Sequence, residues 1–245
     1  MKRNVFVRPN LAGTFFVLAL FVIPLLLTPV GANAELLYDN TNTGFHYYAP
    51  MYRSTAPGTV LEYGDEITLG GTDRFVNSVE LPFALVTIPA FTTGSIDLLL
   101  SFYKNDGAGG QPSTLIWSNS YDNLQLTGPG NEYLFNLSVP AVTVPDSFTW
   151  TVVASDLQSS TALTFFNSGL LIYDPPTVGT SGDFVWQKSA EVWEKGIYSG
   201  GTTPLPSNFG IKISSDTAPV PEPATMLLLA CGLAGLAGMR KRLRK

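Results

Sequence analysis

The stretch "SIDLLLSFY", residues Ser95–Tyr103, indicates the fold most directly. Ile96, Leu98, Leu100 and Phe102 occupy every second position in it. Because successive side chains of a β-strand point to opposite faces of a sheet, this spacing places all four on one face. The stretch is therefore predicted to be a strand with one face in a hydrophobic core.

The same alternation recurs along the chain in "FVNSVELPF", "YLFNLSV", "FTWTVVAS" and "FGIKIS". The positions expected on the core-facing side of these four runs are Phe75, Asn77, Val79, Leu81 and Phe83; Tyr133, Phe135, Leu137 and Val139; Phe148, Trp150, Val152 and Ala154; and Phe209, Ile211 and Ile213. Turn-forming clusters such as "LGGTD", "NDGAGG" and "TGPGN" separate such runs. Several short strands with turns between them predict an all-β fold, a single β-sandwich or jelly-roll-like domain over residues 35–213.

The amino-terminal residues 1–34 have the features of a secretory signal peptide. They start with basic residues, continue with the apolar stretch Phe15–Leu27 and end in the small residues of Ala32-Asn33-Ala34. Cleavage is expected between Ala34 and Glu35. An uncleaved membrane anchor is the alternative, for which the apolar stretch is short.

The carboxyl-terminal end has three parts. Residues 214–223 contain three prolines among small polar residues and are expected to form an extended linker. Residues 224–239 carry no charge, and as a helix they would span about 24 Å, slightly short of a hydrocarbon core of about 30 Å. A basic tail over residues 240–245 is expected on the cytoplasmic side, which holds the body outside. Its charged residues are Arg240, Lys241, Arg242, Arg244 and Lys245.

This ending resembles the PEP-CTERM sorting signal of Gram-negative bacteria. The resemblance lies in "VPEP" at Val220, Pro221, Glu222 and Pro223, followed by one apolar helix and an arginine-rich tail. It implies that exosortase, a membrane-embedded cysteine protease, cuts near this motif. The precursor is then held in the inner membrane transiently, and the product reaches the cell surface or the extracellular matrix. Proteins with this signal usually accompany exopolysaccharide and biofilm production, and a plain tail anchor is the alternative.

The body carries weaker similarities to exported β-sandwich proteins that bear such a tail. They lie in "GDEITLGGTDR" at Gly64–Arg74, "FYKNDGAGGQPSTLIW" at Phe102–Trp117, and "DFVWQKSAEVWEKG" at Asp183–Gly196. These similarities imply a jelly roll and give no indication of a ligand.

The composition of the body excludes several classes of protein. Residues 35–221 hold six basic and 18 acidic residues, a net charge of −12 that repels nucleic acid and anionic lipid. The only cysteine, Cys231, lies in the terminal apolar segment. The body therefore has no thiol for a disulfide or a thiolate metal site, and we expect no cofactor and no nucleic-acid partner.

Signals for chemistry in the body are weak. His46 is the only histidine and has no recognisable nucleophile motif beside it, so no catalytic residue is assigned. A pair of carboxylates for glycoside hydrolysis could be hidden among the acidic residues. The loop "KNDGAGG" makes Asp106 a weak metal candidate, with Asp39 or Asp73 as distant helpers, but it lacks the spacing of a calcium loop.

Trp186 and Trp193 lie in the polar context "WQKSAEVWEKG" and are expected to be an exposed pair that could stack on sugar rings. Three functions follow as hypotheses. The first is a non-enzymatic, exported surface or matrix protein associated with polysaccharide. The second is a carbohydrate-binding module with a defined glycan ligand, and the third, less favoured, is a glycoside hydrolase.

Overall fold

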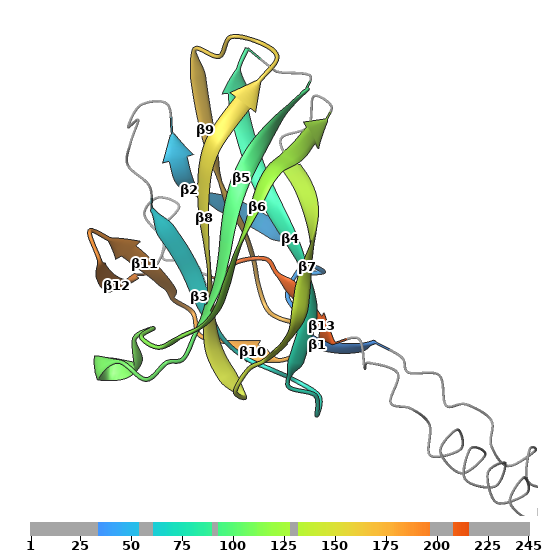
Figure 1. Ribbon diagram of the computed structural model, residues 1–245, viewed down its shortest axis with the longest axis vertical. Coiled ribbons are helices and arrows are strands. Elements are labelled where there is room, and N and C mark those ends of the chain that lie inside the picture. The colour runs from blue at the N-terminus through green and yellow to red at the C-terminus, as the bar shows by residue number, and fades with distance from the viewer. Residues whose placement is uncertain (1–33, 54–60, 90–92, 128–131, 197–207, 216–245) are drawn as a thin grey trace, which may run out of the picture. The chain divides into compact units, whose positions relative to one another are not determined.

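Two antiparallel β-sheets pack face to face and enclose one hydrophobic core (Figure 1). The computed structural model describes residues 34–53, 61–89, 93–127, 132–196 and 208–215, all of which belong to one compact unit. The prediction of an all-β sandwich is confirmed for this part of the chain.

The described strands form a six-stranded and a seven-stranded sheet. The six-stranded sheet contains β1 (Glu35–Asp39), β13 (Lys212–Ser215), β4 (Phe75–Ile88), β9 (Phe165–Tyr173), β2 (Phe45–Arg53) and β7 (Glu132–Thr143). The seven-stranded sheet contains β12 (Val192–Gly196), β11 (Val185–Ser189), β3 (Glu62–Thr68), β8 (Ser147–Ser159), β5 (Thr93–Tyr103), β6 (Leu115–Thr127) and β10 (Thr180–Ser181). A short 3₁₀ turn, η2 (Ala108–Gly110), lies between β5 and β6.

The strand order is that of a jelly roll. Strands β2 to β9 form one four-stranded row in the order β2-β9-β4-β7 and a second in the order β3-β8-β5-β6. Most consecutive strands therefore lie in different sheets, as in a double-sheet jelly roll. The remaining strands extend these rows: β13 and β1 beside β4, and β10, β11 and β12 beside β3.

The alternation in sequence correctly identifies most of the core. Register pairs Leu98 with Ala154, Leu100 with Val152, and Phe102 with Trp150, so the apolar faces of β5 and β8 coincide. The predicted core residues that are at most 6% exposed are Val79, Leu81, Phe83, Ile96, Leu98, Leu100, Phe102, Phe135, Leu137, Val139, Phe148, Trp150, Val152, Ala154, Phe209, Ile211 and Ile213. Tyr133 is partly buried against this core.

The prediction was wrong for Phe75, which is 52% exposed, while its neighbour Val76 is fully buried. The pairing of β4 with β7 shifts between Val76 and Ser78, which indicates a β-bulge or irregularity. Val76 and Val79, three positions apart, are both fully buried, so the core-facing side of β4 changes across this irregularity. Alternation counted back from Val79 therefore assigns Phe75 to the wrong face.

The first and last described strands are paired, with Glu35 opposite Ser215. The Glu35 carboxylate accepts hydrogen bonds from the backbone N–H groups of Thr72 and Asp73, both at 2.9 Å, which lower its pKa. Ser215 donates a hydrogen bond from its hydroxyl to Asp73 Oδ2 at 2.8 Å. Strand β13 thus includes Ser214 and Ser215, the first two residues of the segment expected to be a linker.

One carboxyl group lies inside the core. Asp65 is on the inward face of β3, opposite Trp150, and is 0% exposed. Its Oδ2 accepts a hydrogen bond from the Phe209 backbone N–H at 3.3 Å, which joins the two sheets. Asp65 Oδ1, Tyr38 Oη and Trp150 Nε1 are buried without a hydrogen-bond partner within the structure described. Burial raises the pKa of Asp65 well above its ordinary value.

Candidate functional site

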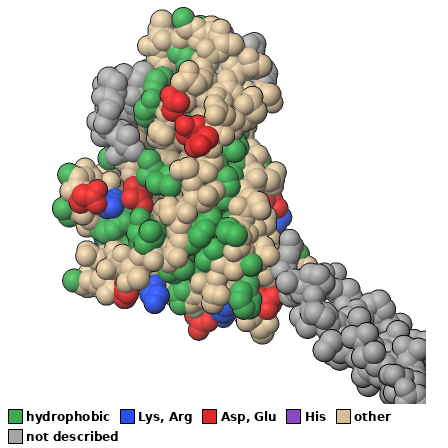
Figure 2. All heavy atoms as spheres, viewed as in Figure 1, with side chains coloured by type: hydrophobic (Ala, Val, Ile, Leu, Met, Phe, Trp, Pro, Cys, Tyr) green, Lys and Arg blue, Asp and Glu red, His purple; other side chains and the backbone are tan. Residues whose placement is uncertain are grey.

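The outer face of the seven-stranded sheet carries a candidate binding site. Residues of β5 and β8 that point away from the core are mostly small and hydroxylated, among them Ser101, Thr149 and Thr151. Figure 2 shows this face, where separate apolar patches and a few acidic and basic groups are set among other side chains and backbone. Ser101, Thr149 and Thr151 are nevertheless at most 2% exposed, so larger side chains cover this part of the face.

The close packing of β3 onto β8 depends on Gly64. A Cβ atom at Gly64 would lie 2.2 Å from the Trp150 carbonyl oxygen and 2.6 Å from Thr151 Cγ2. Because these distances are far below van der Waals contact, a side chain here would force the strands apart. Gly64 therefore keeps Glu62, two residues earlier on the same face, close to β8.

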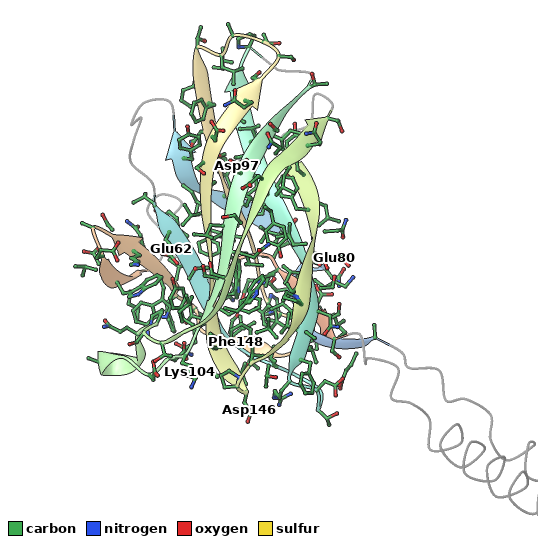
Figure 3. The ribbon with its side chains drawn as sticks, in the orientation of Figure 1. Glu62, Glu80, Asp97, Lys104, Asp146 and Phe148 are labelled. Carbon is green, nitrogen blue, oxygen red and sulfur yellow. The ribbon has the colours of Figure 1, made fainter. Side chains whose placement is uncertain are left out.

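Five side chains meet at this place, and we call them the Trp193 cluster: Glu62, Tyr103, Lys188, Glu191 and Trp193. Glu62 Oε1 accepts a hydrogen bond from Thr151 Oγ1 at 2.5 Å, and Glu62 Oε2 lies 3.7 Å from Lys188 Nζ. Figure 3 places Glu62 on β3, beside the β11–β12 hairpin. The hairpin thus brings charged and aromatic groups onto the face of the sheet.

Lys188 and the two rings complete the Trp193 cluster. Lys188 Nζ lies 2.9 Å from Glu191 Oε2 and 5.6 Å from the centroid of the Trp193 ring. The hydrogen bond to Glu191 raises the pKa of Lys188, so the ammonium stays charged at neutral pH. Tyr103 meets Trp193 edge to face, with ring centroids 5.6 Å apart. Burial, and secondly the Glu62 carboxylate, raise the pKa of Tyr103.

The structure separates the two tryptophans that were expected to act together. Trp186 is only 4% exposed, so it offers no face for stacking, and this part of the prediction was wrong. Its ring packs edge to face against Phe184 at 5.9 Å, with Lys195 Nζ 5.7 Å from its centroid. Trp193 is partly exposed and remains a candidate. The polar residues around Trp186 in sequence did not reveal that Phe184 and Lys195 cover it.

The Trp193 cluster has the chemistry of a shallow saccharide site. A partly exposed indole offers an apolar surface, while the carboxylate, ammonium and phenol groups beside it accept and donate hydrogen bonds. Sugars present both kinds of surface, since their ring C–H groups are apolar and their hydroxyls are polar. This arrangement supports binding.

The other sequence candidates are placed as follows. Asp106 is exposed, and its two carboxylate oxygens accept hydrogen bonds from the backbone N–H and the hydroxyl of Thr114, at 2.9 and 2.7 Å. The hydrogen bond from the Thr114 backbone is the main cause of the lowered pKa of Asp106. These bonds close the loop between β5 and β6. Within the described ranges no group of three or more His, Cys, Asp or Glu residues is placed to hold a metal. His46 belongs to β2, but its side chain lies outside the described residues.

Sequence reasoning missed a hollow on the outer face of the six-stranded sheet. It has a volume of about 360 Å³ and is lined by Thr41, Glu80, Pro82, Glu132, Leu134 and Tyr173, among others. These residues come from β4, β7 and β9 and from the loop after β1, so no local pattern joins them. Only the strand order brings them together.

The expected delivery segments lie mostly outside the described residues. This holds for residues 1–33, including Ala32, and for residues 216–245, including the sorting motif Val220–Pro223 and the basic residues from Arg240 to Lys245. Ala34 is described and directly precedes β1. Among the described residues, no helix has the length and hydrophobicity to cross a membrane.

Fold and site together define a jelly-roll body with a shallow polar and aromatic face. Comparison with protein families adds that residues 219–242 match the PEP-CTERM protein-sorting motif. The resemblance seen in the sequence is thereby confirmed, and the chain carries a sorting signal that implies export and processing by exosortase from a membrane-anchored precursor. No curated protein and no solved structure matches the chain.

Proposed function

We propose that this chain is a non-enzymatic protein of the cell surface or extracellular matrix of a Gram-negative bacterium. In this proposal exosortase removes the carboxyl-terminal segment, and the jelly-roll body associates with extracellular polysaccharide. The observation that carries the proposal is the match of residues 219–242 to the sorting motif directly after a folded all-β body.

The pairing of β1 with β13 supports processing at both ends of the body. Glu35 and Ser215 lie opposite each other, so the two segments to be removed leave the body at one place. The last strand is held from both sides, by β1 and by β4, and Lys212 Nζ lies 2.7 Å from Glu80 Oε1. Cleavage near Pro221 would therefore leave the core and its strands unchanged.

The Trp193 cluster supports association with polysaccharide. Both carboxylates of this cluster are engaged, Glu62 by Thr151 and Lys188, and Glu191 by Lys188. An engaged carboxylate on an open face suits hydrogen bonding to a polymer better than acid–base chemistry, which needs a group free to exchange protons with the substrate. The net charge of −12 disfavours anionic polymers.

Two measurements test this proposal. The intact mass of the exported protein should correspond to a chain that begins at Glu35 and ends near Pro221. Native gels cast with neutral polysaccharides should retard the protein, and Trp193→Ala should abolish the retardation.

Val192→Ala is the matched control, because Val192 adjoins Trp193 in β12 and is 60% exposed. It should leave the retardation unchanged. An exported protein of full-length mass, or equal retardation of the Trp193→Ala variant, would contradict the corresponding half of the proposal.

A further inference from the structure

The hollow on the outer face of the six-stranded sheet has an apolar floor. Pro82 on β4 lies opposite Leu134 on β7, and Leu171 on β9 is 1% exposed beneath the same hollow. Leu134 is 55% exposed, although it is a large apolar side chain. The floor is therefore a surface against which the apolar face of a small ligand can pack.

Tyr173 forms a fixed wall of this hollow because Gly210 has no side chain. A Cβ atom at Gly210 would lie 2.6 and 2.8 Å from two carbons of the Tyr173 ring and 3.4 Å from Pro82 Cγ. The ring therefore packs directly against the backbone at Gly210. The Tyr173 backbone N–H also donates a hydrogen bond to the Asn208 carbonyl at 3.0 Å. A ring fixed in this way loses little entropy when a ligand stacks on it.

Two carboxylates face the hollow and one ammonium balances them only in part. Glu80 lines it from β4 and shares its Oε1 with Lys212 Nζ at 2.7 Å. Figure 3 labels Glu80 on β4, which pairs at this position with β13 on one side and β7 on the other. Glu132 lines it from the start of β7 and is close enough to Tyr173 to contribute, after burial, to the raised pKa of that tyrosine. The hollow thus keeps an excess negative charge beside an aromatic ring.

We propose that this hollow binds a protonated amino sugar, as a unit of a polysaccharide. The apolar face of the sugar packs on Pro82 and Tyr173, its ammonium pairs with Glu132 while Glu80 adds negative charge further along the hollow, and Thr41 hydrogen-bonds a hydroxyl. A neutral sugar would offer the excess carboxylate hydrogen bonds but no opposite charge, and an anionic sugar would be repelled by it. The body's net charge of −12 favours the same cationic ligand.

This site lies on the face opposite the Trp193 cluster, since the two sheets pack through their inner faces. The amino-sugar proposal rests on the proposed function only in taking a polysaccharide as ligand. The two proposals can fail separately, because Trp193→Ala tests the site on the seven-stranded sheet, whereas changes at Glu80 and Glu132 test the hollow on the six-stranded sheet.

The test is calorimetric titration of the full-length chain, in a non-ionic detergent at pH 6, with glucosamine hexamer and with N-acetylglucosamine hexamer. We expect the glucosamine hexamer to bind about tenfold more tightly, the ratio given by a difference of roughly 1.4 kcal/mol. Glu132→Gln should reduce this ratio, and the Glu80→Gln, Glu132→Gln double variant should abolish it.

Asp122→Asn removes an exposed carboxylate of β6 outside both sites and should keep the ratio. Unfolding midpoints of all variants establish that they are folded; if Glu80→Gln unfolds the chain, Glu132→Gln alone decides. The proposal would be overturned if the two hexamers bound equally or if neither bound. It would also be overturned if Asp122→Asn lowered the ratio of affinities as much as Glu132→Gln does. Equally tight binding of a lysine hexamer would show that the site recognises charge without a sugar, which also overturns it.

Discussion

Replacement of Asp65 by asparagine should change how the stability of this protein depends on pH. Asp65 is fully buried between the sheets, and only its Oδ2 has a described hydrogen-bond donor, the Phe209 N–H at 3.3 Å. Burial disfavours the charged carboxylate and raises the pKa above its ordinary value of 3.8. Asparagine has nearly the same shape, carries no charge, and retains an oxygen to accept the Phe209 hydrogen bond.

The sign of the effect follows from proton binding. Between the unfolded and folded pKa values of Asp65, the folded protein holds a proton that the unfolded chain has released. Folding is therefore most favourable below the unfolded pKa and weakens as pH rises towards the folded pKa. One such group lowers the free energy of unfolding by about 1.4 kcal/mol for each pH unit in that window.

The assay is denaturant unfolding of the full-length chain in detergent from pH 5 to pH 7, followed by tryptophan fluorescence. Trp150 lies opposite Asp65 and is fully buried, so it reports on this core. The stability of Asp65→Asn minus that of the unchanged protein should rise with pH, with a slope of at most about 1.4 kcal/mol per unit while the pH lies between the unfolded and folded pKa values. Subtraction removes the titration of the groups that both proteins share.

Asp122→Asn, which removes an exposed carboxylate of β6 away from the core, is the matched control for the loss of one acidic side chain. Glu35 and Asp106 have lowered pKa values, so they act below this pH range and with the opposite sign. A constant difference between Asp65→Asn and the unchanged protein would show that Asp65 ionises in the folded state as it does in the unfolded chain. That result would refute the reasoning.

Three further predictions concern packing. Trp150→Ala should lower the free energy of unfolding by about 3–5 kcal/mol in denaturant titrations, because it empties the centre of the core; a loss below 1 kcal/mol would contradict this. Gly64→Ala should cost about 1–3 kcal/mol in the same assay, because its Cβ would overlap the Trp150 carbonyl oxygen; an unchanged midpoint would exclude the overlap. Trp186→Ala should lower the unfolding midpoint and leave retardation by polysaccharide intact, because Trp186 is buried. Trp193→Ala should leave the midpoint nearly unchanged and abolish the retardation. The same result for both variants would contradict this assignment.

Local alternation was enough to predict the fold class and most of the core. In β5 and β8 every second residue is buried over the predicted stretch, because both strands lie in the middle of their sheet and keep a regular face. The prediction failed at Phe75, where the irregularity between Val76 and Ser78 changes the face. A bulge depends on the partner strand, and for this reason alternation within one strand does not reveal it.

The candidate sites were harder to predict than the core. Tyr103 and Trp193 are 90 positions apart and meet only because the β11–β12 hairpin pairs with β3 in the same sheet as β5. Glu80 and Tyr173 likewise come from different strands. Contacts of this kind depend on strand order, which alternation leaves open. The sorting signal is different, because its parts are contiguous and can be recognised without a fold.

The position of β13 determines how the body would bear mechanical load. A force applied beyond Ser215 along the axis of β13 acts on a strand that is bonded on one side to β1 and on the other to β4. Tension in that direction stretches both ladders of hydrogen bonds at once, in shear. The strand that connects the body to its anchor therefore resists extraction more strongly than a strand peeled from the edge of a sheet.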